Sequence, residues 1–252
     1  MQFVRKIISL SILKIFTGLL PIGEKALISF WIESFKNVSE IQKAIIVTND
    51  KFNEQFYKSK KWYNPQDFPL EIFNDGSTSN ETRLGAVVDI KFALDKSEND
   101  DTLVIAGDTL FYPDFDLQKF IEEFKRLKKV KKEPLALIVD CPCPEDEVHK
   151  HGIIEINDDN QVTSFLEKPK ATETKSRSQS PCFYLFDQKC QEIIGDFLEH
   201  TKNLPIEKRD ATGNFLAYLI PKANVYAFDT NGRYDVGNLS SYKFCIENFN
   251  DM

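Results

Sequence analysis

Three short runs of consecutive apolar residues constrain the fold of this 252-residue chain more than any other feature. They are Ala-Ile-Ile-Val-Thr at 44–48, Thr-Leu-Val-Ile-Ala at 102–106 and Leu-Ala-Leu-Ile-Val at 135–139. Runs of this length that are apolar at nearly every position are typical of strands covered on both faces. We therefore predict a central sheet with helices on both sides.

Segments with apolar residues three and four positions apart lie between these runs. They cover residues 27–35, 84–94 and 120–127, and they predict amphipathic helices. Because strand and helix alternate, we predict an α/β fold with a doubly wound, mostly parallel mixed sheet. The length fits one domain and no linker composition interrupts the chain, so we treat residues 1–252 as a single domain.

The second half of the chain predicts a small β-hairpin. Its strands are residues 152–156 and 162–166, and Asp158-Asp159-Asn160 supplies the turn. The polar stretch 170–180 predicts a mobile surface loop. The elements predicted after it are a strand at 182–186, a helix over 193–198 and a late strand at 225–228.

The charge balance limits the partners of the chain. It has 39 acidic and 32 basic side chains and a net charge of −7, whereas broad nucleic-acid binding needs clustered positive charge. No clear apolar stretch of about 18 residues is present, which argues against a membrane span. We therefore expect neither a nucleic-acid nor a membrane partner.

The cysteines and the first residues bear on localisation. Five cysteines, an odd number, do not describe a disulfide framework and favour a reducing compartment. The basic start and the largely apolar residues 7–20 loosely resemble a signal peptide, but Lys14 interrupts the run and no small-x-small cleavage pattern follows. We expect a cytoplasmic protein.

Two aspartates are the first candidates for chemistry. Asp108 follows Gly107 directly after the predicted strand 102–106, at the sheet edge where open α/β sheets bind ligands. Asp235 follows the late strand, in Tyr-Asp-Val-Gly. Two carboxylates suffice for Mg²⁺ when substrate phosphates complete its coordination. Each motif taken alone is also a common turn, so the prediction depends on the two meeting.

Glu167-Lys168-Pro169 follows the second hairpin strand. Adjacent side chains of an extended chain point to opposite faces, so a joint role for the acid and the base requires a twist, which the proline helps to fix. The alternative is an exposed strand end with neutralised charge.

Together these motifs resemble the sugar-1-phosphate nucleotidyltransferases, the NDP-sugar pyrophosphorylases that include glucose-1-phosphate thymidylyltransferase. Upstream, the residues Leu-Leu-Pro-Ile-Gly-Glu-Lys-Ala-Leu-Ile at 19–28 are similar to the segment that leads into the first helix of that family. The resemblance covers roughly residues 18–244. The motifs that carry it, in order, are Gly107-Asp108, Gly152-Ile153-Ile154, Glu167-Lys168-Pro169, Phe183-Tyr184-Leu185-Phe186 and Tyr234-Asp235-Val236-Gly237.

The resemblance implies a Rossmann-like nucleotidyltransferase fold and a Mg²⁺-assisted reaction. A sugar 1-phosphate attacks the α-phosphorus of a nucleoside triphosphate and yields a nucleotide-sugar and pyrophosphate. The implied roles are catalysis by Asp108, Lys168 and Asp235, metal binding by Asp108 and Asp235, and acceptor binding by Gly152, Glu167, Lys168 and Tyr184.

The resemblance also implies a nucleotide-binding segment. Residues 74–86 are similar to a Gly-Thr-x-Ser-Asn-x-x-Arg-Leu-Gly-Ala pattern, in which small residues let the nucleotide approach a helix start. Thr78 and Gly85 are the implied contacts there, together with Gly107 and Asp108. Ser79 or Asn80 is also a plausible helix N-cap.

The beginning of the chain departs from the family pattern. The family opens with a strand and a glycine-rich loop that cradles the triphosphate, whereas residues 1–17 contain no glycine, and Thr17 stands where the family has a lysine. We expect an incomplete first strand and weak turnover from the chain as written. The alternatives are a non-catalytic regulatory homologue that binds a nucleotide-sugar, and a cytidylyltransferase acting on phosphocholine or a phosphonate.

The sequence leaves the oligomeric state open. Phe244 and Phe249 in the predicted last helix fit either the surface of a homo-oligomer or packing on the sheet, and we favour the packing.

Overall fold

A computed structural model describes residues 6–10, 17–58, 68–79, 81–97 and 100–249. Its longer strands are β1 (Lys6–Leu10), β4 (Ala44–Thr48), β5 (Leu70–Asn74), β6 (Thr102–Ala106), β8 (Leu135–Pro142), β9 (Gly152–Ile156), β10 (Val162–Glu167), β12 (Phe183–Phe186) and β13 (Asn224–Asp229). The short strands are β2 (Pro21–Ile22), β3 (Lys25–Ala26), β7 (Thr109–Phe111), β11 (Ser178–Gln179) and β14 (Arg233–Asp235).

The α-helices are α1 (Leu27–Lys36), α2 (Asp50–Lys58), α3 (Ala86–Asp95), α4 (Leu117–Val130), α5 (Gln188–Thr201), α6 (Ile206–Arg209), α7 (Thr212–Leu219) and α8 (Leu239–Asn248). Three 3-10 helices, η1 (Thr17–Leu19), η2 (Glu145–Lys150) and η3 (Ile220–Lys222), complete the described elements.

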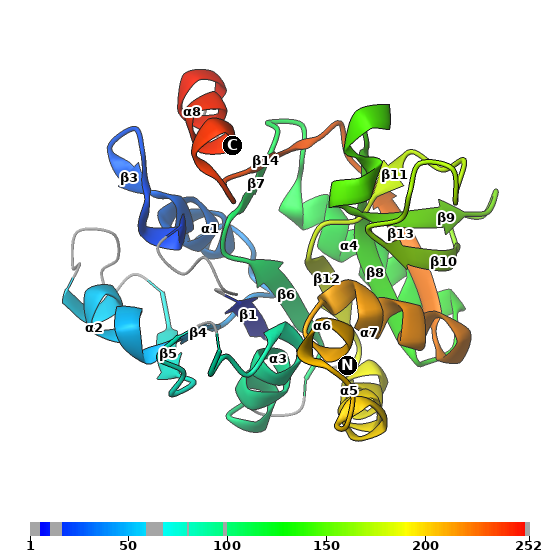
Figure 1. The fold of residues 1–252 in the computed structure, drawn as a ribbon, viewed down its shortest axis with the longest axis horizontal. Helices are drawn as coiled ribbons and strands as arrows, with labels where there is room; N and C mark the ends of the chain where they lie inside the picture. The colour runs from blue at the N-terminus through cyan, green and yellow to red at the C-terminus, as the bar shows by residue number, and fades with distance from the viewer. Residues whose placement is uncertain (1–5, 11–16, 59–67, 80, 98–99, 250–252) are drawn as a thin grey trace.

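A ten-stranded sheet organises the described residues (Figure 1). Its order is β10-β9-β11-β8-β12-β6-β1-β4-β5, and β13 pairs with β8 beside this path. The predicted strands 44–48, 102–106 and 135–139 are β4, β6 and the first part of β8, and all their residues except half-buried Ala106 are buried. The expected α/β sheet is therefore confirmed.

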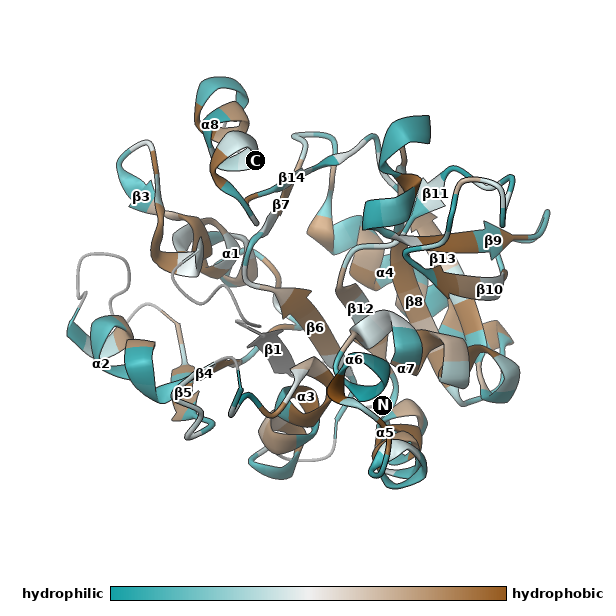
Figure 2. Cartoon of the chain, in the orientation of Figure 1, coloured by the Kyte–Doolittle hydropathy of each residue, from teal (hydrophilic) through white to brown (hydrophobic). Residues whose placement is uncertain are grey.

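Successive residues of the central strands enter two separate cores. In β6, Leu103 and Ile105 belong to one buried cluster and Val104 to the other. The first cluster packs under α1 and α4, and the second under α3, α5 and α7. Figure 2 accordingly shows β6 and β8 as hydrophobic strands between helices that turn polar residues outward. This alternation explains why the strands read as continuous apolar runs.

The sheet is mixed, and parallel pairing is confined to two parts of it. Strands β6, β1, β4 and β5 are parallel neighbours, as are β8 and β13. From β6 outward through β12, β8, β11, β9 and β10, all neighbours along the path are antiparallel. The sheet is thus less parallel than we predicted, because β12 and β11 insert as antiparallel strands.

The expectation of an incomplete first strand is wrong. The main chain of β1 pairs in parallel with both β4 and β6, so it occupies the centre of the sheet. Its five residues lie in the basic and apolar stretch that loosely resembled a signal peptide. Residues 11–16, which follow this strand, lie outside the described residues, so the departure from the glycine-rich loop stays a sequence observation.

The predicted hairpin is confirmed, whereas the predicted surface loop at 170–180 is partly wrong. Strands β9 and β10 pair antiparallel, and Asn160 in the turn has a φ of 59°. Within 170–180, however, β11 joins β8 to β9, and Thr174, Gln179 and Ser180 are buried. Polar residues enter the sheet here because their main-chain groups complete the ladder.

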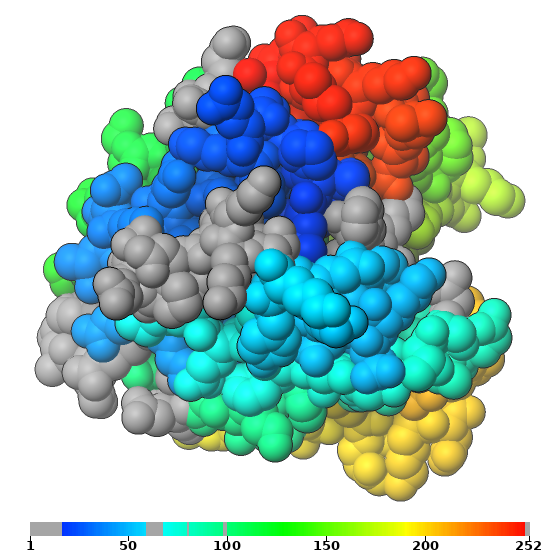
Figure 3. All heavy atoms as spheres, turned by 90° about the vertical axis from the view of Figure 1, so that its left-hand side faces the viewer, coloured from blue at the N-terminus to red at the C-terminus, as the bar shows by residue number. Residues whose placement is uncertain are grey.

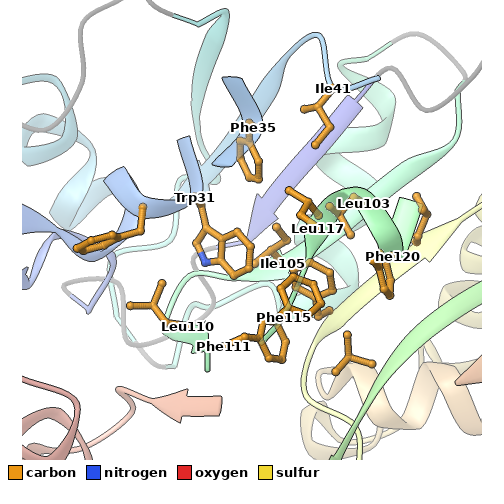
Figure 4. Close-up of a cluster of buried hydrophobic side chains, with 14 of the residues drawn as sticks. Trp31, Phe35, Ile41, Leu103, Ile105, Leu110, Phe111, Phe115, Leu117 and Phe120 are labelled. Atoms are coloured by element: carbon orange, nitrogen blue, oxygen red, sulfur yellow. The ribbon is translucent and has the colours of Figure 1, made fainter. Parts of the chain in front are cut away.

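An aromatic cluster fixes the position of β7 (Figure 4). Trp31 on α1 contacts Phe111 and Phe115 edge to face and also contacts Phe183. Its indole N–H donates a 2.8 Å hydrogen bond to the carbonyl oxygen of Thr109. Buried aromatic pairs of this kind hold the residue that follows Asp108 in one place.

The last helix packs on β14 of the two-stranded sheet, where Phe244 and Phe249 both contact Tyr234, and it also reaches the β2–β3 corner. The Tyr242 hydroxyl donates to the carbonyl oxygen of Pro21 at 2.7 Å, and Figure 3 shows the C-terminal residues lying against the N-terminal ones. Phe249 packs on Phe30 and Tyr234, whereas Phe244 remains half exposed. Within the described residues, no helix combines the length and apolar character that crossing a bilayer requires.

Candidate active site

A short antiparallel ladder brings the two predicted aspartates together. Strand β7 begins at Thr109, directly after Asp108, and β14 ends at Asp235; in the ladder, Asp235 stands opposite Thr109. The N–H of Val236 donates to the carbonyl oxygen of Asp108 at 2.8 Å. The two acids, 127 positions apart in the sequence, therefore lie at one edge of the sheet, beyond the carboxyl end of β6.

Asp235 is held by a buried guanidinium. Arg233 Nη2 lies 3.1 Å from Asp235 Oδ2, and the side chains are 9% and 40% exposed respectively. Asp235 Oδ1 accepts a hydrogen bond from the Gly237 N–H at 2.9 Å. Burial raises the pKa of Asp235, but the Arg233 charge and the Gly237 hydrogen bond outweigh it and lower the pKa below its ordinary value. Asp235 is therefore a carboxylate at neutral pH.

The chain twists at Lys168, as the Glu-Lys-Pro motif required. Lys168 has a left-handed φ of 51°, which brings its Nζ to 3.9 Å from Glu167 Oε1. The Lys168 side chain is 62% exposed and that of Glu167 is 25% exposed. Burial raises the pKa of Glu167 above its ordinary value, and the charge of Lys168 offsets only part of this rise. An exposed cation thus stands beside a half-buried carboxyl group at the end of β10.

His151 joins the Glu-Lys pair to the aspartates. The Lys168 N–H donates to the carbonyl oxygen of His151 at 3.0 Å, and His151 Nδ1 lies 3.4 Å from Arg233 Nη2. Burial and the Arg233 charge lower the pKa of His151. Since Arg233 also contacts Asp235, a continuous series of contacts connects Lys168 to Asp235. The structure thus brings the predicted acceptor and metal residues into one region.

Gly152 is required by a close approach of side chains. It pairs with Glu167 in the β9–β10 ladder. A Cβ atom at Gly152 would overlap the Phe165 ring, and a Cβ at Gly213 on α7 would overlap both that ring and the Glu167 carboxylate. The ring therefore lies between two glycines, and α7 packs tightly enough on β10 to fix Glu167.

Tyr184 is buried in the core beside the start of α7. It is 2% exposed, and its hydroxyl lies 3.3 Å from Thr212 Oγ1 at the start of α7. Burial raises its pKa well above the ordinary value, so the hydroxyl stays protonated. The acceptor role implied for Tyr184 remains a prediction.

The implied nucleotide segment forms a compact loop at the ends of β4 and β5. The N–H groups of Thr78 and Ser79 both donate to Thr82 Oγ1, at 3.0 Å each. Gly85 has a φ of 103° and precedes the first residue of α3. Because β4, β5 and β6 run parallel, this loop shares the sheet edge with buried Gly107 and with Asp108. Within the loop, Thr78 is exposed and Gly85 is buried.

The suggestion that Ser79 or Asn80 caps the helix is wrong. Helix α3 begins at Ala86, and the N-cap position is Gly85, which has no side chain to donate or accept. Asp210, 124 positions away, accepts the hydrogen bond of the Ala86 N–H at 2.7 Å. Asn80 itself lies outside the described residues.

The residues at this edge fit a magnesium ion bound together with substrate phosphates. No group of three histidine, cysteine, aspartate or glutamate side chains suited to a metal occurs among the described residues. Two carboxylates are nevertheless the kind of donor set that Mg²⁺ uses beside a triphosphate, and the lowered pKa keeps Asp235 ionised. Asp108 and Asp235 are the two that the β7–β14 ladder places together.

A cleft of about 860 Å³ opens beside Asp235. Its lining combines polar, acidic and aromatic groups, including Gln179, Arg233, Asp235, Tyr112 and Phe244. A cavity of this size with a few convergent polar groups can hold a small ligand.

Sequence reasoning missed three contributors: Arg233, His151 and Asp210. Arg233 had a usable signal, because residues two apart in a strand share one face and Arg233 precedes Asp235 by two positions. His151 and Asp210 had none, since their contacts depend on tertiary packing.

Comparison with known proteins identifies the family of the chain. The family model described as "Nucleotidyl transferase" matches residues 13–250. A glucose-1-phosphate adenylyltransferase from Clostridium novyi is 28% identical over 175 residues, covering 69% of this chain and 43% of its own. The bifunctional protein GlmU from Methanococcus vannielii is 26% identical over 239 residues, covering 91% and 50%. The chain thus spans about half the length of these curated relatives.

Solved structures share the fold. A UDP-glucose pyrophosphorylase complexed with UDP-glucose superposes with a TM-score of 0.75 at 15% identity, covering 97% of this chain and 98% of that one. A UTP-bound UGPase from Acinetobacter baumannii gives a TM-score of 0.72 at 15% identity, covering 97% and 93%.

Proposed function

The chain belongs to the nucleotidyl transferase family, and on that premise we propose that it joins a nucleoside triphosphate to a sugar 1-phosphate. An oxygen of the sugar phosphate forms a bond to the α-phosphorus, and the bond from that phosphorus to the β-phosphate oxygen breaks. The products are a nucleotide-sugar and pyrophosphate. The five cysteines are free, which supports our proposal that the reaction takes place in the cytoplasm.

One observation carries the proposal: the β7–β14 ladder sets Asp235 beside Asp108, and Arg233 and His151 connect this pair to Lys168. Phosphoryl-type transfer needs mainly positioning and neutralisation of charge. Two neighbouring carboxylates and an exposed lysine meet these requirements. Of the proposed catalytic residues, the lining of the cleft includes Asp235 but neither Asp108 nor Lys168, so the cleft opens beside the pair of acids.

Each side chain then has a defined task. Lys168, with its mostly exposed ammonium group, binds the phosphate of the acceptor. Glu167 accepts hydrogen bonds from sugar hydroxyls while α7 holds its carboxylate in place. Asp108 and Asp235 would hold Mg²⁺, which when bound neutralises charge on the phosphates. The backbone at Thr78, Gly85 and Gly107 forms the side of the site toward the nucleotide.

The position of β1 supports the family fold at the start of the chain, while the departure from the glycine-rich loop remains a sequence observation. In the sequence, the weakest point of the catalytic interpretation was the start of the chain. The main chain of residues 6–10 nevertheless pairs with β4 and β6 at the centre of the sheet, next to the strand that leads to Asp108.

The test is pyrophosphate release with Mg²⁺ from a panel of five triphosphates (ATP, CTP, GTP, UTP and dTTP), each combined with several sugar 1-phosphates. We expect release with at least one pair, and Asp108→Asn should lower it by about a hundredfold or more. Asp158→Asn, in the exposed hairpin turn, is the matched control and should keep full activity.

Two other outcomes would replace the proposal. A nucleotide-sugar that raises the thermal unfolding midpoint without any pyrophosphate release would identify a non-catalytic binding homologue. Turnover of CTP with phosphocholine or a phosphonate, and with no sugar phosphate, would identify a cytidylyltransferase with a different acceptor.

A further inference from the structure

Asp210 contacts the implied nucleotide-binding segment that precedes α3, called the nucleotide loop below, from a distant part of the chain. Its Oδ1 accepts the hydrogen bond of the Ala86 N–H at 2.7 Å, and its Oδ2 forms an ion pair with Arg83 Nη2 at 3.0 Å. Asp210 therefore supplies the cap that Gly85 cannot provide for α3. A carboxylate at a helix N-terminus also interacts favourably with the helix dipole.

The contact is close and mostly shielded from water. The side chains of Arg83 and Asp210 are 27% and 13% exposed. A Cβ atom at Gly85 would stand 3.1 Å from Asp210 Oδ1 and 3.2 Å from its Cα, so the loop backbone rests directly on Asp210. Ion pairs so shielded are screened less than surface pairs.

The residues that follow Asp210 reach the acceptor side of the site. Two positions on, Thr212 Oγ1 lies 3.3 Å from the Tyr184 hydroxyl. Three positions on, Gly213 faces Phe165 and the Glu167 carboxylate so closely that no Cβ fits. The segment 210–213 thus contacts the nucleotide loop at one end and the proposed acceptor residue at the other.

We infer that Asp210 is a positioning residue: it fixes the position of the acceptor-binding residue Glu167 relative to the nucleotide loop. This inference rests on the proposed function. Any shift of the loop that repositions Ala86 or Arg83 moves the residues that hold Glu167. Because segment 210–213 contacts both the nucleotide loop and the Glu167 carboxylate, removing the Asp210 carboxylate should alter the affinity for both substrates.

The experiment compares Asp210→Ala with Asp210→Asn and Arg83→Met. Asparagine keeps an acceptor for the Ala86 N–H but loses the charge that pairs with Arg83. Asp116→Ala is the matched control, since Asp116 caps α4 on the other face of the sheet through the Lys119 N–H at 3.1 Å. The nucleotide probe is whichever of ATP, CTP, GTP, UTP and dTTP raises the unfolding midpoint most, and glucose 1-phosphate is the acceptor probe.

Dissociation constants of both probes are measured by calorimetry, together with the two KM values wherever turnover occurs. We expect Asp210→Ala to weaken both probes about tenfold, Asp210→Asn and Arg83→Met to have smaller effects on both, and Asp116→Ala to change neither. If Asp210→Ala lowers the unfolding midpoint as Asp116→Ala does but leaves both affinities within twofold, the inference is wrong.

Failure of the proposed function would look different. In that case the unsubstituted protein would release no pyrophosphate with any pair of substrates. The binding comparison needs no turnover, so the joint effect of Asp210→Ala on the two probes would still be measured.

Discussion

The backbone N–H of Val236 donates a hydrogen bond of 2.8 Å to the carbonyl oxygen of Asp108. This contact joins the end of β14 to Asp108, which lies between β6 and β7, and it places Asp235 next to Asp108 in space. The separation of the two acids is therefore set by main-chain pairing, while side-chain contacts such as that of Arg233 orient the carboxylates. A site built on strands in this way is held more rigidly than one built on loops.

The space around Phe165 gives a first prediction. Gly152→Ala should destabilise the protein by about 1–3 kcal/mol, because the new methyl group overlaps the Phe165 ring. The measurement is the free energy of unfolding in urea. Gly195→Ala, in α5 with its nearest neighbour at 3.9 Å, is the control and should be neutral or stabilising by about 0.5–1 kcal/mol.

The double variant Gly152→Ala with Phe165→Leu sharpens this test. Because the smaller side chain makes room for the methyl group, the double variant should lose less stability than the sum of the single variants. Simple additivity would show that the ring does not exclude the methyl group.

The backbone at Lys168 gives a second prediction. A left-handed φ of 51° costs a residue with a Cβ atom more than it costs glycine. Lys168→Gly should therefore be about 1 kcal/mol more stable than Lys168→Ala in thermal unfolding. Both variants lack the ammonium group, so both should show the same large increase in KM for the acceptor.

An equal stability of these two variants would argue against the twist. If the alanine variant lost less acceptor binding than the glycine variant, position 168 would act through its backbone geometry. That result would contradict the proposal that the Lys168 ammonium group binds the acceptor phosphate.

The buried acid beneath the nucleotide loop gives a third prediction. Burial raises the pKa of Asp89 to about 8, helped by the nearby charges of Asp75 and Asp210, the latter paired with Arg83. The unfolded chain releases this proton near pH 4, whereas the folded protein keeps it until about pH 8. The contribution of Asp89 to stability is thus full at low pH and is lost as the pH rises through the folded pKa.

The measurement is urea unfolding at several values between about pH 6.5 and 8.5. This window lies above the titration midpoint of Asp140, because burial raises the pKa of that residue to about 6. The stability of the wild type relative to Asp89→Asn should fall by about 1–2 kcal/mol across this range. Parallel pH profiles of the two proteins would mean that Asp89 is already ionised in the folded state.

The sequence predicts the elements of this fold best where local residues decide them. Strands β4, β6 and β8 are found because their side chains alternate between two apolar cores, which leaves nearly every position apolar. Strand β11 was missed because Ser178 and Gln179 are polar residues that join the sheet through main-chain pairing and side-chain hydrogen bonds, with no apolar pattern to mark a strand. Strand β1 was missed because a basic start followed by apolar residues also suits other roles.

In the site, too, local motifs could be predicted from the sequence and contacts between distant residues could not. The resemblance and the motifs pointed to Asp108, Asp235, Glu167 and Lys168. Strand pairing brings the two aspartates together, and contacts through His151 and Arg233 connect them to Lys168. The cap of α3 by Asp210 could not be predicted, because 124 positions of chain separate the two partners and only the packing of α7 brings them together.

The central claim is that Asp108 and Asp235 act as one site, and a double-mutant cycle tests it most directly. The quantity measured is the affinity for Mn²⁺, by electron paramagnetic resonance, in the presence of a non-hydrolysable α,β-methylene triphosphate of the preferred base. The variants are Asp108→Asn, Asp235→Asn and the combination of both. We predict that each single substitution weakens Mn²⁺ at least about tenfold and that the double variant is scarcely weaker than the worse single one. Two independent losses that simply add, or no loss from either substitution, would contradict a shared site.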